Sequence, residues 1–213
     1  MAKVKICGLN DPDSVRRAAE AGADWIGFVF FDRSPRAVTP EAVETLLLSI
    51  GNATPVALLV DPDDGLIDRV IRLGIRTLQL HGHEAPERVA EIKARTGAQV
   101  WKAAGVSSRA DLDALSAYEA ADRLLADAKP PKDADRMGGH GRSFDWSVLE
   151  GWKPLKPWIL AGGLTPYNVT GAIALTGASA VDVSSGVERA PGLKDIDKIE
   201  AFIEAAKDAT ANI

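Results

Sequence analysis

The sequence predicts an α/β protein, a (β/α)8 barrel in a single domain that spans residues 1–213. Eight short apolar segments alternate with eight helical segments, which indicates parallel strands joined by crossover helices. Polar, chemically useful residues follow nearly every apolar segment, and in a barrel these positions share one face. No G-x-G-x-x-G pattern follows the first apolar segment, which disfavours the alternative of a doubly wound open sheet.

The first half of the chain contains four predicted strands separated by polar segments. They are expected at Val4–Cys7, Trp25–Phe31, Pro55–Val60 and Thr77–Leu80. The second of these is apolar throughout, as expected for a strand covered on both faces. Three helices are expected between them, each begun by a residue that can cap it: from Asp11 or Asp13 to Ala21, from Thr39-Pro40, and from Asp61–Asp64 to Gly74.

The second half repeats this alternation with one long interruption. Strands are expected at Gln99–Ala103, Arg123–Ala126, Trp158–Ala161 and Ala180–Val183. The helical segments are expected at Pro86–Arg95, from Ser107 or Ser108, as one turn at Asp145–Leu149, from Thr165-Pro166 to Gly177, and at Leu193–Asp208. The interruption, Lys129–Arg142, is polar and contains glycines, and its length predicts a cover over a binding site.

Charge and composition exclude several classes of partner. The net charge of −5 gives no electrostatic reason to expect nucleic acid or an anionic membrane surface. No apolar run approaches the roughly 18 residues that span a bilayer, and no signal-peptide core is evident. Cys7 is the single cysteine, which excludes an internal disulfide and fits a reducing compartment. We therefore expect a cytoplasmic protein.

Two glycine-rich turns follow the last two predicted strands. Gly162-Gly163 ends the first of these strands and Ser184-Ser185-Gly186 ends the second. Adjacent glycines let backbone N–H groups approach an anion, serines add hydroxyl donors, and barrels often bind phosphate with these two loops. The sequence predicts that these five residues bind a phosphate. The alternative is a pair of ordinary turns with glycine at tight corners.

Five further candidates lie at or near strand ends. They are Cys7, Arg36, His81, Asp127 and Asp182. Each has a simpler alternative, such as a small buried residue for the cysteine or a solvated loop cation for the arginine. Asp127 is the hardest to dismiss, because a carboxylate that ends a buried strand is costly unless it is paired, solvated or used. The histidines at 81 and 83 complete no tetrahedral cluster, so no metal is predicted.

Strand alternation also predicts an ion pair inside the barrel. Lys5 and Cys7 share one side of the first strand, and Asp182 and Ser184 share one side of the last. In a closed barrel these two strands are neighbours. Because a charged residue inside a strand usually needs a partner, we expect Lys5 to pair with Asp182.

Taken together, the chain resembles the phosphoribosylanthranilate isomerases of tryptophan biosynthesis. The likeness extends from end to end in order and spacing. It rests on these segments: Val4–Gly8, Gly27–Phe30, Ser34–Arg36, Leu78–Gly82, Leu125–Asp127, Gly138–Gly141, Phe144–Trp146, Leu160–Leu164 and Val181–Glu188. The chain departs from the family pattern at Ala128, where threonine is common, and at His140, where a small polar residue is expected.

The resemblance implies a (β/α)8 fold without a cofactor and an Amadori rearrangement of N-(5-phosphoribosyl)anthranilate. It implies that Cys7 is the general base and Asp127 the general acid, that Arg36 holds the anthranilate carboxylate, and that the two glycine-rich loops hold the phosphate. His81 and Asp182 would lie next to the substrate. The only partner expected is this phosphosugar, and the chain is expected to be a monomer or homodimer.

Two other functions share these features. Indole-glycerol-phosphate synthase and other phosphosugar barrels use a similar phosphate site, and fold alone does not separate them. The synthase would need a lysine and a glutamate at strand ends. Lys102 lies on the fifth strand, but no glutamate ends a neighbouring strand. A non-catalytic phospholigand-binding protein, with Cys7 as a redox switch, is the third hypothesis.

Overall fold

The computed structural model describes residues 1–128 and 145–209. The expected cover, residues 129–142, and His140 within it lie outside the described residues. The structure can therefore be compared with all eight predicted strands and with every predicted connection except this cover.

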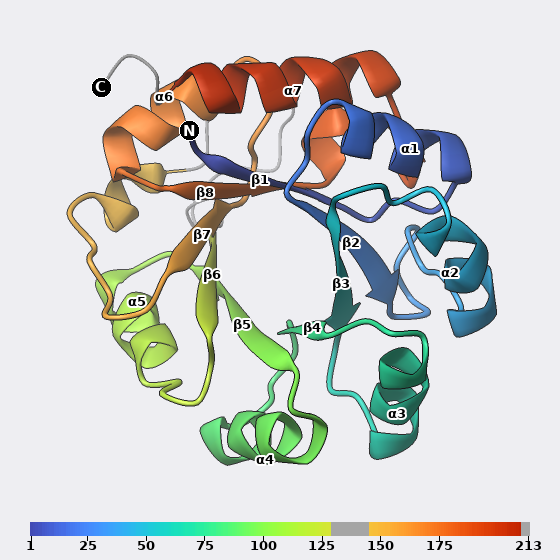
Figure 1. Ribbon diagram of the computed structural model, residues 1–213. Helices are drawn as coiled ribbons and strands as arrows, with labels where there is room; N and C mark the ends of the chain where they lie inside the picture. Colours follow the sequence, from blue (N-terminus) through green and yellow to red (C-terminus); the bar gives the residue numbers. More distant parts are fainter. Residues whose placement is uncertain (129–144, 210–213) are drawn as a thin grey trace.

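Eight parallel strands close into a barrel, as predicted, and follow one another around it in chain order. Figure 1 shows them arranged about a common axis with the helices outside. The strands are β1 (Lys3–Cys7), β2 (Trp25–Phe30), β3 (Thr54–Leu59), β4 (Thr77–Leu80), β5 (Gln99–Val106), β6 (Arg123–Ala128), β7 (Trp158–Ala161) and β8 (Ala180–Val183). Pairing of β8 with β1 closes the barrel and sets Lys5 opposite Asp182.

Seven α-helices form the outer layer of the described structure. They are α1 (Pro12–Glu20), α2 (Pro40–Leu47), α3 (Asp64–Arg72), α4 (Pro86–Thr96), α5 (Arg109–Ser116), α6 (Val169–Thr176) and α7 (Ile196–Asp208). Side-chain caps begin most of them, because an N-cap oxygen satisfies a backbone N–H that has no partner within the helix. The capping residues are Asp11, Thr39, Asp63, Ser108 and Asp195. None of the described helices is long and apolar enough to cross a bilayer.

Two helices begin later than predicted, each for a local reason. The helix expected from Thr165 begins at Val169, because the Asn168 side chain accepts from the N–H of Thr165 and donates to the carbonyl of Gly163. These bonds hold the preceding residues in a turn. The helix expected from Leu193 begins at Ile196, because residues 193–194 form β10.

A short hairpin replaces the expected start of the last helix. β9 (Glu188–Ala190) pairs antiparallel with β10 (Leu193–Lys194), which places Glu188 opposite Lys194. It follows a single 3₁₀ turn, η2 (Ser185–Val187), at the end of β8. The hairpin therefore carries the chain from the predicted phosphate loop to α7.

Residues after β6 bear out the prediction of a single helical turn. The described connection to β7 contains the 3₁₀ turn η1 (Trp146–Leu149), capped by Asp145. β6 itself extends two residues beyond its predicted end, so Asp127 is the second-last residue of the strand rather than the residue after it. Strand alternation places its side chain on the same face as Leu125, towards the barrel interior.

The barrel interior is closed at the end where the strands begin. Trp25 and Trp101 meet edge to face with ring centroids 5.2 Å apart, and the Arg123 guanidinium lies 5.0 Å from the Trp25 ring. These residues start or lie early in their strands, and apolar side chains from several strands pack above them. Because side chains fill the barrel at the end where the strands begin, a binding site can form only at the opposite end, where the strands terminate.

Candidate active site

A cavity of about 530 Å³ lies at the carboxyl ends of the strands. All ten predicted site residues line it: Cys7, Arg36, His81, Asp127, Gly162, Gly163, Asp182, Ser184, Ser185 and Gly186. Apolar residues such as Val29, Phe31 and Leu58 complete the wall. Polar groups that converge in a largely apolar cavity of this size are typical of a small-molecule site.

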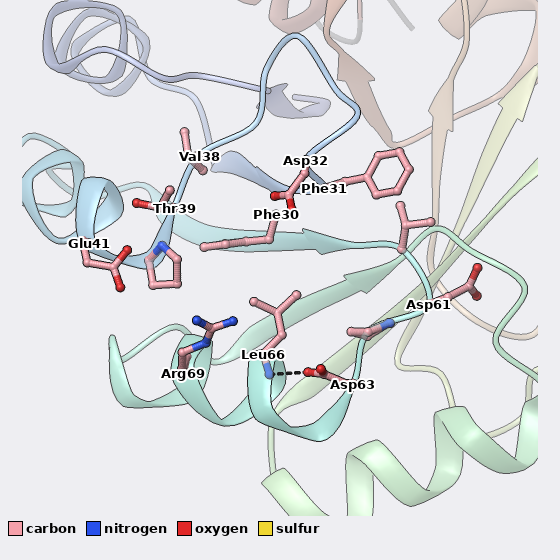
Figure 2. A pocket seen from close by; sticks show the side chains of 13 residues that line it. Phe30, Phe31, Asp32, Val38, Thr39, Glu41, Asp61, Asp63, Leu66 and Arg69 are labelled. Carbon is pink, nitrogen blue, oxygen red and sulfur yellow. Dashed lines mark hydrogen bonds between the residues drawn. The ribbon is translucent and has the colours of Figure 1, made fainter.

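A second cavity, of about 420 Å³, lies outside the first, between the start of α2 and the start of α3. Phe31 and Val60 line both cavities and so form the wall between them. Figure 2 shows the second cavity with the carboxylates of Asp32, Glu41, Asp61 and Asp63 and the guanidinium of Arg69. Four carboxylates against one cation disfavour a phosphorylated ligand there, and no predicted site residue lines it.

The predicted ion pair inside the barrel is confirmed. Lys5 Nζ lies 3.0 Å from Asp182 Oδ1, and both side chains are almost fully buried. Gly27 on β2 makes room for this arrangement, because a Cβ atom there would lie 2.8 Å from Cys7 Sγ and 3.0 Å from Lys5 Nζ. The thiol, the ammonium and the carboxylate therefore form one compact cluster at the floor of the cavity.

Burial determines the charge state of this cluster. It raises the pKa of the Cys7 thiol above the ordinary cysteine value and outweighs the Lys5 ammonium, which acts in the opposite direction. Lys5 on its own favours the thiolate, but in the free protein it does not bring the pKa of Cys7 below the ordinary value. Burial alone would lower the pKa of Lys5, but Asp182 and Cys7 raise it, so Lys5 stays protonated.

Asp127 and His81 are neighbours in the lining of the cavity. His81 Nε2 lies 3.6 Å from Asp127 Oδ2, and His81 Nδ1 lies 3.3 Å from Nε2 of the buried Gln79. The Asp127 side chain is 35% exposed in the free protein.

Arg36 is already paired on one side. Its Nε and Nη2 donate to Oε1 and Oε2 of Glu188 at 2.6 and 2.7 Å, a two-pronged contact. Lys194 Nζ donates to Glu188 Oε1 at 2.9 Å. Burial alone would raise the pKa of Glu188, but the bonds from Arg36 and Lys194 outweigh it and lower that pKa. The carboxylate therefore stays ionised between two cations.

The two predicted phosphate loops touch each other. A Cβ atom at position 186 would lie 1.8 Å from the carbonyl oxygen of Leu164, so only glycine permits this approach. Gly162 and Gly163 both have positive φ, at 92° and 62°. The indole of Trp146 donates to the carbonyl of Gly162, as Asn168 does to that of Gly163. Carbonyl oxygens that would repel an anion are thus engaged elsewhere.

Lys102, the residue on which the synthase alternative depends, does not line the cavity. Its Nζ donates to Glu84 Oε2 at 2.6 Å and to the carbonyl of Gly82 at 2.8 Å, and both side chains are buried. Strand alternation points Lys102 outward, since its neighbours Trp101 and Ala103 fill the barrel interior. This buried lysine–glutamate pair joins β5 to the loop after β4.

Several residues of the site were not predicted. Val29 shares the inward face of β2 with Gly27, and Phe31 continues the same alternation one residue after the strand, so period-two alternation could have identified all three. Glu188 lies in a segment that carries the family likeness, but no local pattern marks it as the partner of Arg36. Lys194 was placed in a helix. Among the described residues, no three His, Cys, Asp or Glu side chains cluster as metal ligands would.

Known proteins match this chain over nearly its whole length. The model of a family described as N-(5'phosphoribosyl)anthranilate (PRA) isomerase matches residues 4–205. A Hyphomonas neptunium protein named N-(5'-phosphoribosyl)anthranilate isomerase is 60% identical over 207 residues, which cover 97% of this chain and 98% of the relative. One from Paramagnetospirillum magneticum is 57% identical over 208 residues, covering 96% and 97%.

Solved structures agree with these relatives. The crystal structure of phosphoribosyl anthranilate isomerase from Thermotoga maritima superposes with a TM-score of 0.87 and 36% identity, covering 98% of this chain and all of that one. A crystal structure of such an isomerase in complex with reduced 1-(o-carboxyphenylamino)-1-deoxyribulose 5-phosphate gives a TM-score of 0.85 and 34% identity, with the same coverage.

Proposed function

Because the chain belongs to the N-(5'-phosphoribosyl)anthranilate isomerase family, we propose that its cavity carries out an Amadori rearrangement with Cys7 and Asp127 as the reacting groups. The chain is an isomerase that converts N-(5-phosphoribosyl)anthranilate to 1-(2-carboxyphenylamino)-1-deoxyribulose 5-phosphate. The observation that carries the proposal is that a thiol and a carboxylate, from β1 and β6, line the same cavity as a guanidinium and two glycine-rich loops.

Asp127 acts first, as general acid. It protonates the ribose ring oxygen while the C–O bond breaks, and the lone pair of the anthranilate nitrogen forms the Schiff base. An acid must hold its proton near neutrality, which favours a carboxyl group shielded from water. In the free protein Asp127 is partly exposed, so the bound aromatic ring and ribose provide that shielding.

Cys7 acts second, as general base. It removes the proton from the second ribose carbon to give an enolamine, which tautomerises to the ketone. Because burial raises the pKa of Cys7, less thiolate is present at neutral pH, but that thiolate is a stronger base once formed. Lys5, held protonated against Asp182, stabilises the thiolate during the transfer.

Substrate binding uses the two anionic ends of the molecule. Arg36 binds the anthranilate carboxylate with the guanidinium edge that Glu188 leaves free. The loops at Gly162-Gly163 and Ser184-Ser185-Gly186 bind the phosphate through backbone N–H groups and hydroxyls. His81 and Asp182 lie beside the reacting carbons, since both line the same cavity as Cys7 and Asp127.

Residues 1–213 form one catalytic domain that works in the cytoplasm on a soluble phosphosugar, as a monomer or a homodimer. A dimeric isomerase from Thermotoga maritima that was converted to monomers gives a TM-score of 0.82 at 33% identity, which is compatible with either state. The synthase alternative loses support because Lys102 is bound to Glu84 behind the cavity wall.

The deciding experiment follows the fluorescence of phosphoribosylanthranilate, which changes as the compound is consumed. The purified chain should remove the substrate catalytically, with product identified by chromatography. A chain that binds the reduced product analogue but never consumes substrate would instead be the non-catalytic phospholigand-binding protein.

A further inference from the structure

Glu188 and Lys194 are buried ionised residues close to the site that do not line its cavity. Their side chains are 4% and 0% exposed, and they face each other across the β9–β10 hairpin. Burial of two charges is costly, so a pair of this kind calls for a reason beyond stability. Neither residue has a role in the proposed chemistry.

Glu188 determines which edge of Arg36 is available to a ligand. A guanidinium has five N–H donors, and Glu188 takes the Nε and one of the Nη2 donors. Three donors are left over, two on Nη1 and the second on Nη2, and the second Nη2 donor forms the other edge of the fork with the adjacent Nη1 donor. A substrate carboxylate can therefore bind Arg36 end-on with two parallel bonds while Glu188 holds it from the side.

Lys194 links this arrangement to the phosphate loop. Its Nζ donates to the carbonyl of Ser184 at 2.9 Å and reaches Ser184 Oγ at 3.4 Å, while also donating to Glu188. Without Lys194, the charge of Glu188 would cancel that of Arg36. Burial lowers the pKa of Lys194, and the bond to Glu188 opposes that shift. With Lys194 protonated, the three side chains carry one net positive charge towards an anionic ligand.

Close backbone contacts fix the hairpin against the Arg36 loop. Gly192, at the hairpin turn, has positive φ, and a Cβ atom there would lie 2.3 Å from the carbonyl oxygen of Pro35. Gly8, after β1, also has positive φ, and a Cβ atom there would lie 2.5 Å from Arg36 Cδ. Gly8 thus lets the Arg36 side chain lie against the end of β1, and Gly192 lets the hairpin turn lie against the residue before Arg36.

We propose that Glu188 and Lys194 are positioning residues that turn the free edge of Arg36 towards the substrate carboxylate and fix its distance from the phosphate loop at Ser184. The proposal rests on the proposed function, because it takes a substrate that carries both a carboxylate and a phosphate. The hairpin then acts as a rigid spacer between the two anion subsites, and selects ligands of one length.

The test measures two ligands against each variant by calorimetry. One is reduced 1-(o-carboxyphenylamino)-1-deoxyribulose 5-phosphate, and the other is the same compound without its ring carboxylate. In Glu188→Gln, the amide NH2 meets the donors of Arg36 or Lys194, so Arg36 is released. The carboxylated ligand should bind at least about tenfold more weakly, because the released Arg36 no longer presents its free edge and this loss outweighs the added positive charge; the decarboxylated ligand should bind within about threefold of wild type.

Lys194→Met provides a second variant with the same readout. It leaves Glu188 to cancel the charge of Arg36, so the preference for the carboxylated ligand should again fall, by about tenfold. Both variants should raise KM for substrate much more than they lower kcat. An unchanged ratio of the two affinities in both variants, whether each affinity is retained or both fall together, overturns the proposal.

Glu84→Gln is the matched control, because Glu84 is equally buried and also pairs with a buried lysine, Lys102. It does not line the cavity and should leave the affinity ratio as in wild type. Turnover by the wild-type chain separates the two claims. If wild type turns over and the affinity ratio does not respond to Glu188, the positioning role alone is wrong; if wild type does not turn over, the proposed function is wrong.

Discussion

Lys5 Nζ lies 3.0 Å from Oδ1 of Asp182, with the thiol of Cys7 packed against the same small space beside Gly27. The ion pair keeps an ammonium charged inside the barrel, where an isolated cation would lose its proton. In the proposed mechanism Asp182 therefore serves Cys7 indirectly, since it keeps Lys5 protonated beside the thiolate. The same carboxylate also opposes thiolate formation by its own charge.

The first prediction concerns the titration of Cys7. Because burial raises its pKa, the thiol is protonated at neutral pH and loses its proton as the pH rises through that raised value. The rate of alkylation by iodoacetamide should reach half its maximum at a pH above about 8.5, which is the ordinary pKa of a cysteine thiol. Lys5→Met removes the cation that favours the thiolate and should move the midpoint higher still. A wild-type midpoint at or below the ordinary value would contradict this account.

The second prediction concerns Arg36. Glu188 occupies Nε and one Nη2 donor, and a lysine ammonium cannot hold Glu188 from the side and a substrate carboxylate from the end. Arg36→Lys should raise KM by at least about tenfold, the loss expected for a charged hydrogen bond. Arg72→Lys, at an exposed position on α3, is the control and should leave KM unchanged. Steady-state kinetics that give equal KM values for the two variants would exclude the carboxylate role.

The third prediction concerns the phosphate loops. Ser185→Asp and Gly163→Asp each place a negative charge where the loops at the ends of β7 and β8 meet. Each should abolish measurable binding of the reduced product analogue at concentrations that saturate wild type, because like charges at this distance repel in a partly buried site. Gly171→Asp adds the same charge on the open surface of α6 and should bind normally. Binding by either loop variant at wild-type strength would leave the loops as ordinary turns.

Local sequence patterns predicted the barrel and its cavity because both depend on short-range signals. Apolar segments, caps and glycines determined the strands and most helix starts, and strand alternation was enough to pair Lys5 with Asp182. These residues are 177 positions apart, but β1 and β8 are neighbours in any closed eight-stranded barrel. The order of strands in the barrel was therefore enough to predict the contact between Lys5 and Asp182.

The features that sequence did not predict depend on packing. Arg36 and Glu188 are 152 residues apart and meet only because the β9–β10 hairpin lies on the Arg36 loop. The pKa of Cys7 depends on how completely the fold excludes water, which no motif reports. The late start of α6 comes from one side chain, Asn168, whose bonds to both sides of the turn outweigh helix signals at Thr165 and Pro166.

The last prediction concerns the two reacting groups. Asp127→Asn keeps the shape of the side chain but has no proton to give, and Cys7→Ser keeps a hydroxyl whose pKa is too high for a base. General acid or base catalysis contributes roughly 10²–10⁴-fold, so each variant should lose at least about a hundredfold in kcat. Both should keep the circular dichroism spectrum of wild type and bind the reduced product analogue, because neither substitution changes volume much or touches Arg36 or the phosphate loops. Ser34→Ala removes a cavity hydroxyl that accepts from the backbone N–H of Arg36 and takes no part in the proposed proton transfers, so it is the control for kcat alone. It should retain kcat within about threefold, well short of the loss assigned to a catalytic group. If Cys7→Ser turned over at a near-normal rate, the thiol would be a packing residue, and the proton on the second ribose carbon would have to go to another group in the cavity, with His81 and Asp182 the next to be substituted.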